Sequence, residues 1–186
     1  MNFKIKFKFV IMNYKMMFLS FSVFLFVSFT IPTKVHKKID KQIKATFEVE
    51  VFDKIGITFS EEVQKDLVAK LNAENFFKIQ ADTKILGYFY YGHGFGKTDE
   101  FDFIVILDAN LIIAKTKVLV YREDHGSEIG SRRWLRQFTG KTGGDILRYQ
   151  YDIAAISGAT LSAESMTETI NDFLASIAIL HEKNIL

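Results

Sequence analysis

The feature that most constrains the fold is a series of four strand-like segments in the middle of the chain. They are rich in aromatic and β-branched residues, and Asp108-Ala109-Asn110 supplies a turn between the last two. The connections between the segments are too short to hold the crossover helices that parallel strands require. The sequence therefore predicts an antiparallel sheet of residues 76–81, 85–91, 101–107 and 112–121.

Helical patterns lie on both sides of these strands. Thr58-Phe59-Ser60-Glu61 is a capping-box pattern, which predicts a helix through about Asn72. The residues of that helix expected to face the core are Val63, Leu67, Val68 and Leu71. A second helix is predicted over residues 161–182, with one buried side formed by Met166, Ile170, Phe173, Leu174, Ile177 and Leu180.

Before the first helix, residues 45–52 alternate between apolar and polar types, which predicts a strand with Phe47, Val49 and Val51 on one face. Together the patterns predict an α+β fold, in which helices pack on a small antiparallel sheet. The polar, charged segment 33–44 is interpreted as a linker or as the continuing end of a preceding helix. The predicted domain then occupies residues 45–186.

The N-terminal segment, residues 1–32, has the pattern of an export signal or a membrane anchor. Residues 1–15 are basic, residues 16–31 form an apolar run, and Pro32 closes it. No small-x-small cleavage site follows, which favours a retained transmembrane anchor over a cleaved signal peptide; a buried core helix is the alternative. The basic side should stay in the cytoplasm, so the domain is expected outside it, on the periplasmic side. Translation begins at Met1 or at Met12.

Composition excludes several kinds of site and partner. The 186-residue chain has no cysteine, which excludes disulfides, cysteine-ligated zinc, iron–sulfur clusters, lipoprotein anchors and cysteine-linked haem or flavin. The net charge is +2, but four lysines and no acid precede Pro32, so the rest carries −2. A slightly acidic body argues against nucleic-acid binding. No metal-ligand spacing relates His36, His93, His125 and His181, so no metal site is predicted.

One short motif carries the candidate chemistry. An apolar run ends in Ser157-Gly158-Ala159-Thr160, and the predicted C-terminal helix begins at once. Gly158 permits a sharp turn, and Thr160 stands near the positive end of the helix, where free N–H groups suit an anion such as phosphate. The simpler interpretation is that Thr160 or Ser162 is only the N-cap of the helix.

In this motif the sequence resembles the FMN-binding domain family, and the resemblance extends over residues 80–182. The family includes subunits of the sodium-translocating NADH:quinone reductase and of the Rnf complex. The resemblance implies that Thr160 carries FMN through a phosphodiester, which a separate flavin transferase forms from FAD. It also implies that Ser157, Gly158, Ala159 and Leu161 contact the cofactor.

Two further segments match the family and complete the predicted FMN site. A Gly-rich turn at Gly92, Gly94 and Gly96 precedes a strand; without the resemblance it would be interpreted as a flexible hairpin loop. A glutamate, a Gly-rich turn and a helix with tryptophan follow, at Glu123, Gly126, Gly130 and Trp134. The cofactor-binding residues predicted in these segments are Gly94, Glu123, Gly126, Gly130 and Trp134.

The chain departs from the family pattern at two positions. Many relatives have aspartate six residues before the threonine, where this chain has Ala154, with Asp152 two residues earlier. If the transferase requires that aspartate, attachment of FMN is slower or absent. His125 departs from the Pro-Gly-Leu-Gly turn of some relatives. The arginines Arg132, Arg133 and Arg136 form either a solvated face or a docking face for an acidic partner.

The sequence therefore predicts an exported, FMN-carrying electron-transfer protein with unidentified membrane or periplasmic redox partners. No acid–base or nucleophile–base pair stands at useful spacing, which favours a carrier or complex subunit over a self-sufficient enzyme. Two alternatives stay open: a module that binds flavin or another ligand non-covalently, and a flavin-free structural domain.

Overall fold

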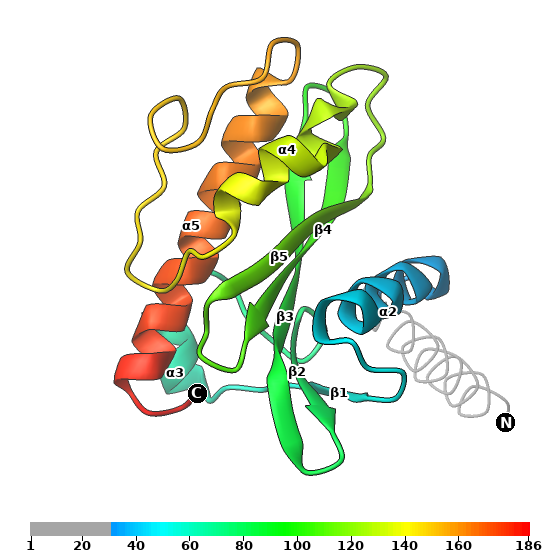
Figure 1. Ribbon diagram of the computed structural model, residues 1–186. Helices are drawn as coiled ribbons and strands as arrows, with labels where there is room; N and C mark the ends of the chain where they lie inside the picture. Colours follow the sequence, from blue (N-terminus) through cyan, green and yellow to red (C-terminus); the bar gives the residue numbers. More distant parts are fainter. Residues whose placement is uncertain (1–30) are drawn as a thin grey trace, which may run out of the picture. The chain divides into compact units, whose positions relative to one another are not determined.

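The computed structural model describes residues 31–186, and the predicted anchor lies outside these residues (Figure 1). Its centre is a five-stranded antiparallel sheet with the strand order β1-β2-β3-β4-β5. The α+β fold and the antiparallel sheet predicted from sequence are confirmed. The strands are β1 (Asp53–Gly56), β2 (Phe76–Ala81), β3 (Lys84–Phe95), β4 (Glu100–Asp108) and β5 (Ile113–Val120).

The long C-terminal helix α5 (Thr160–Glu182) covers one face of the sheet (Figure 1). All six apolar residues predicted for its inner side are buried. Phe173 is central to this core: its ring stacks on Tyr90 at a centroid distance of 4.6 Å and meets the edge of Phe76 at 5.8 Å. The predicted helix and its buried side are confirmed.

Helix α2 (Thr33–Phe47) covers the opposite face of the sheet. Val35, Ile39 and Ile43 are buried in a second core with sheet residues such as Ile104. Lys38 Nζ also donates a hydrogen bond of 2.6 Å to the Leu119 carbonyl of β5. Of the two interpretations of residues 33–44, a linker or the end of a preceding helix, the structure shows a helix, and the strand predicted over residues 45–52 is wrong.

The physical reason for this correction is the continued helical spacing of apolar residues. Phe47 follows Ile43 by one helical turn and packs partly buried against the second core. The helix ends at Glu48, which has a left-handed backbone (φ 56°). Val51, predicted to share one strand face with Phe47, is 84% exposed, and the strand β1 begins only at Asp53.

Helix α3 (Glu61–Asp66) is shorter than predicted. Ser60 is its N-cap and accepts a hydrogen bond from the Val63 N–H, as the capping-box pattern indicated. The chain leaves the helix after Asp66 because Ala69 N–H binds the Ser176 hydroxyl of α5, at 2.7 Å. Val68 is therefore exposed, whereas Leu71 is buried as predicted.

The Gly-rich segment is part of the sheet and not a flexible loop. Strand β3 continues through Gly92 and Gly94, which pair with Phe103 and Phe101 of β4. A side chain at Gly94 would collide with the ring of Phe101, which is fully buried. The glycines thus leave room for the aromatic side chains of the neighbouring strand.

Between β5 and α5 the chain forms three short helices and a long irregular segment (Figure 1). The short helices are η2 (Ser127–Gly130), α4 (Arg132–Leu135) and η3 (Arg136–Phe138). Trp134, Leu135 and Phe138 are buried in the core on the α5 side of the sheet. Within residues 31–186, no helix has the length and apolar character needed to cross a membrane.

Candidate functional site

Thr160 is the first residue of helix α5, and its side chain is exposed. The N-cap is Ala159, and no side chain caps this helix end within the described residues. Gly158, with φ +80°, makes the tight turn before it, and Ala159 N–H donates to the Ile156 carbonyl at 3.2 Å. The N-cap interpretation of Thr160 and Ser162 is therefore wrong, because the capping position belongs to a residue without a polar side chain.

The loop after β5 packs directly on this turn. Tyr121 Oη donates a hydrogen bond of 2.8 Å to the His125 carbonyl and lies 3.2 Å from the Ser162 hydroxyl. Gly126 has φ +83°, and an added Cβ would lie 2.9 Å from Ala159 Cβ and 3.0 Å from the Gly158 oxygen. Gly126 thus needs both a left-handed backbone and the absence of a side chain.

Glu123 holds the turn between β3 and β4. Its carboxylate accepts hydrogen bonds from the Thr98 N–H (2.6 Å), the Thr98 hydroxyl (2.7 Å) and the Asp99 N–H (3.0 Å). The backbone hydrogen bonds from Thr98 and Asp99 lower the pKa of Glu123 to about 2, so it is ionised at neutral pH. Both oxygens of the Glu123 carboxylate therefore already accept hydrogen bonds from within the protein.

A hollow of about 620 Å³ opens beside Thr160, and we call it the Thr160 hollow. It lies between the start of α5, the loop after β5 and the β3–β4 turn. Five of the predicted site residues line it: Glu123, Gly158, Ala159, Thr160 and Leu161. The other lining residues are Lys97, Thr98, Tyr121, Asp124, His125 and Ser162.

The remaining predicted site residues do not line the hollow. Ser157 is exposed in the turn that precedes Thr160. Gly126 lies close to Ala159 and Gly158, which do line the hollow. Trp134 is buried, and its indole Nε1 donates a hydrogen bond of 2.7 Å to the Ala154 carbonyl. Gly94 lies in β3, and Gly130 ends η2. Contact of these residues with FMN stays a prediction.

The positions of Ala154 and Asp152 bear on the missing aspartate. Ala154 is exposed, and its backbone is fixed from both sides, by the Gln137 side chain and the Trp134 indole. Asp152 accepts hydrogen bonds from the Arg148 side chain and backbone at 2.8 and 2.9 Å. Asp152 is therefore engaged in its own turn, and the effect of Ala154 on the attachment of FMN stays a prediction.

An ionic cluster around the buried Asp102 was not predicted from the sequence. Asp102 is 2% exposed and binds Arg122 Nη2 at 2.7 Å and His93 Nδ1 at 3.0 Å. Burial raises the pKa of Asp102, but the hydrogen bonds and charges of Arg122 and His93 outweigh burial and hold it below its usual value. The available signal was an aspartate between Phe101 and Phe103 in a strand.

An exposed aromatic side chain on the strand beside α5 was also missed. Phe95 is 62% exposed at the end of β3, and its N–H donates a hydrogen bond of 2.8 Å to the Ser165 hydroxyl of α5. Leu161, one turn before Ser165, is 53% exposed. Exposed apolar side chains therefore lie on two elements that this hydrogen bond joins. Within residues 31–186, no group of three or more acidic or histidine side chains could hold a metal ion.

One family model matches the part of the chain that holds this site. Residues 94–175 match the family model of the FMN-binding domain. The predicted resemblance to that family is thus confirmed. The matched segment contains Thr160, the Thr160 hollow and every predicted cofactor residue, and it supports FMN as the cofactor.

Among solved structures, the chain is similar to NqrC of Shewanella oneidensis, with 17% sequence identity and a TM-score of 0.49. The similarity covers 71% of this chain and 70% of that chain. A comparison with curated protein sequences finds no match.

Proposed function

We propose that this FMN-binding domain carries FMN covalently on Thr160 and transfers electrons with it. One observation carries the proposal: within a segment that matches the FMN-binding domain, an exposed threonine begins a long helix whose N-terminus has no side-chain cap. The hydroxyl of Thr160 has no capping role in the fold, so it is available for chemistry.

The start of α5 suits a phosphate group. The first N–H groups of any helix lack partners within the helix, and the helix dipole favours negative charge there. The N-cap Ala159 has no oxygen to satisfy these groups, and the first turn contains no acidic residue. A phosphate on Thr160 would therefore find donors and no competing carboxylate from the helix itself.

Attachment requires an external catalyst. The Thr160 oxygen would form a bond to the FMN phosphorus of FAD while the bond from that phosphorus to AMP breaks, and the hydroxyl proton would pass to a base. Within residues 31–186 no carboxylate or imidazole hydrogen-bonds to Thr160. The base and the metal ion of this step therefore belong to a separate flavin transferase.

The surroundings of Thr160 offer a place for a flavin ring. Leu161 and Tyr121 line the Thr160 hollow, and the exposed Phe95 stands on the neighbouring strand end. Apolar and aromatic side chains with a few polar groups are typical of a cofactor site. Bound FMN would supply the redox chemistry, and these side chains would hold and orient its ring.

We further propose that the domain works outside the cytoplasm, anchored through the N-terminal segment, and exchanges electrons with membrane or periplasmic partners. The support is the basic and apolar pattern of residues 1–32, which is typical of an export signal or anchor. A domain that carries its own flavin and shows no catalytic pair fits an electron carrier better than a complete enzyme.

In-gel flavin fluorescence after denaturing electrophoresis tests the covalent link, with the full chain co-expressed beside an active flavin transferase. We expect a fluorescent band that disappears in Thr160→Ala. Ser157→Ala is the matched control, because it removes an exposed hydroxyl from the same turn and should leave the band bright.

Two other outcomes would contradict covalent attachment. Flavin that co-purifies with the native protein but leaves it on denaturation would favour non-covalent binding. A colourless protein, with the transferase active on a control substrate, would favour a structural domain without flavin.

A further inference from the structure

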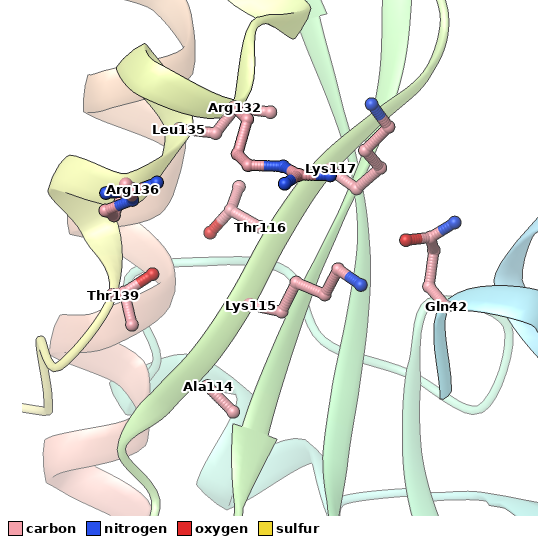
Figure 2. A pocket seen from close by; sticks show the side chains of 9 residues that line it. All are labelled: Gln42, Ala114, Lys115, Thr116, Lys117, Arg132, Leu135, Arg136 and Thr139. Carbon is pink, nitrogen blue, oxygen red and sulfur yellow. The ribbon is translucent and has the colours of Figure 1, made fainter. Parts of the chain in front are cut away.

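A second concave site lies at the edge of the sheet, away from the residues of the Thr160 hollow. It is a groove of about 370 Å³ along β5, the last strand in the sheet order, and the two sites share no lining residue. Four cationic side chains line this basic groove, as Figure 2 shows: Lys115, Lys117, Arg132 and Arg136. The other lining residues are Gln42, Ala114, Thr116, Leu135 and Thr139.

The cations reach the groove from three elements. Lys115 and Lys117 project from β5, whereas Arg132 belongs to α4 and Arg136 begins η3. In Figure 2 the Arg132 side chain extends from α4 over β5 towards Lys117. Within residues 31–186, none of the four forms a salt bridge, and no acidic residue lines the groove.

The positive charges of these four side chains repel one another, and a bound anion would relieve this repulsion. Burial lowers the pKa of Lys115, and the charges of Lys117 and Arg132 lower it further. Lysines on an edge strand have a simpler explanation, since they prevent strands of other molecules from pairing there. That explanation does not account for Arg132 and Arg136, which line the same groove from α4 and η3.

Thr116 lies between the two lysines but faces the other side of the strand. Lys115 and Lys117 pair with Ile106 and Ile104, which belong to the core under α2, whereas Thr116 pairs with Val105 of the core under α5. The Thr116 Oγ1 is buried, and Figure 2 shows it pointing away from the Lys115 side chain. The charged side of the groove is therefore formed by the lysines and Arg132.

We propose that the basic groove binds a phosphate group, held by Arg132, Lys115 and Lys117. An oxyanion with several acceptor oxygens matches the planar donor set of arginine and the point charge of lysine. Its negative charge would also offset the repulsion among these cations. The phosphate group belongs either to a soluble phosphate ester or to a lipid headgroup, and both present the same oxygens.

Isothermal titration calorimetry of the full chain in a neutral detergent tests the proposal, with inorganic phosphate as the probe and sodium chloride at equal ionic strength as the blank. We expect saturable binding of phosphate that Arg132→Gln weakens about tenfold or more, as the loss of a charge-assisted hydrogen bond predicts. Arg133→Gln is the matched control, since Arg133 lies on the same helix outside the groove and should keep wild-type affinity.

Three results would each overturn the proposal. They are unchanged affinity in Arg132→Gln, an equal loss of affinity in Arg132→Gln and Arg133→Gln, and heat no larger than the chloride blank.

A second probe distinguishes the two sources of the phosphate group. Glycerophosphoglycerol, a phosphodiester, represents the headgroup of an anionic lipid, whereas inorganic phosphate represents a soluble ester. Tighter binding of the diester supports a lipid headgroup as the ligand, and tighter binding of phosphate supports a soluble one. None of these measurements depends on FMN, so the groove can fail while the proposed function stands.

Discussion

At the scale of single residues, Gly126 is the position where the loop after β5 packs against the turn that precedes Thr160. Gly126→Ala should destabilise the fold, because alanine is strained at φ +83° and its Cβ would lie within 3.0 Å of Ala159 and Gly158. A left-handed backbone alone costs roughly 1–2 kcal/mol in an alanine residue. The contacts should add to this loss, which urea unfolding measures.

Gly140 is the matched control for this substitution. Its φ of +84° is nearly the same, but an added Cβ would meet nothing within 4 Å. Gly140→Ala should therefore show the backbone strain alone, a loss of about 1–2 kcal/mol. Equal losses in the two variants would contradict the close packing of the loop on the turn.

Glu123 should make the fold sensitive to acid. Its pKa is about 2 in the folded protein, below the ordinary glutamate value of 4.5, so its ionised form favours folding. That stabilisation is present above pH 4.5 and is lost as the pH falls towards 2. Glu123→Gln should lower the melting temperature at neutral pH, and the difference from wild type should shrink across this interval.

Circular dichroism melting curves at a series of pH values measure the effect. Glu128→Gln, at an exposed glutamate of η2, is the control and should leave the melting temperature close to wild type throughout. A Glu123→Gln deficit that stays constant from neutral pH to about pH 2 would show that the charge of Glu123 does not stabilise the turn.

At the scale of elements, the packing of α5 on the sheet should dominate stability. Phe173→Ala should cost about 3–5 kcal/mol, because a fully buried ring between Tyr90 and Phe76 leaves a cavity. Leu161→Ala removes an apolar side chain from the same helix where it is 53% exposed and should cost about 0.5 kcal/mol or less. Chemical denaturation measures both, and similar losses would contradict the assigned core.

The elements also show which parts of the fold could be predicted from sequence. Strand β2 and helix α5 were predicted closely, because alternation and helical spacing are strong where one face is buried. Helix α2 was not distinguished from a linker, because its charged residues concealed a spacing of four between Val35, Ile39 and Ile43. The extension of β3 was missed because Gly92 and Gly94 indicate a loop unless the opposing aromatic rings are known.

The candidate site was predictable where the chemistry is local in sequence. The turn, the helix start and Thr160 lie within four residues, so the motif alone located them. The partners of Glu123 could not be predicted, because Thr98 is 25 residues away and meets it only in the folded hairpin. The ionic cluster of Asp102 and the lining of the basic groove likewise join residues that are distant in sequence.

At the scale of the whole molecule, the described chain is a sheet between two helices, with α5 on one face and α2 on the other (Figure 1). The two candidate sites belong to different parts of it. The Thr160 hollow uses the start of α5 and the loops around it, whereas the basic groove uses the edge strand β5. A domain of this kind can carry a flavin at one site and bind a second ligand at the other.

The central claim is that Thr160 bears FMN through a phosphodiester, and mass spectrometry of the Thr160 peptide tests it most directly. The full chain would be produced beside an active flavin transferase, digested, and sequenced by tandem fragmentation. We predict that this peptide gains the mass of FMN less one water and that the fragments assign the addition to Thr160. An unmodified peptide beside a flavinylated control substrate, or FMN on any other residue, would contradict the account.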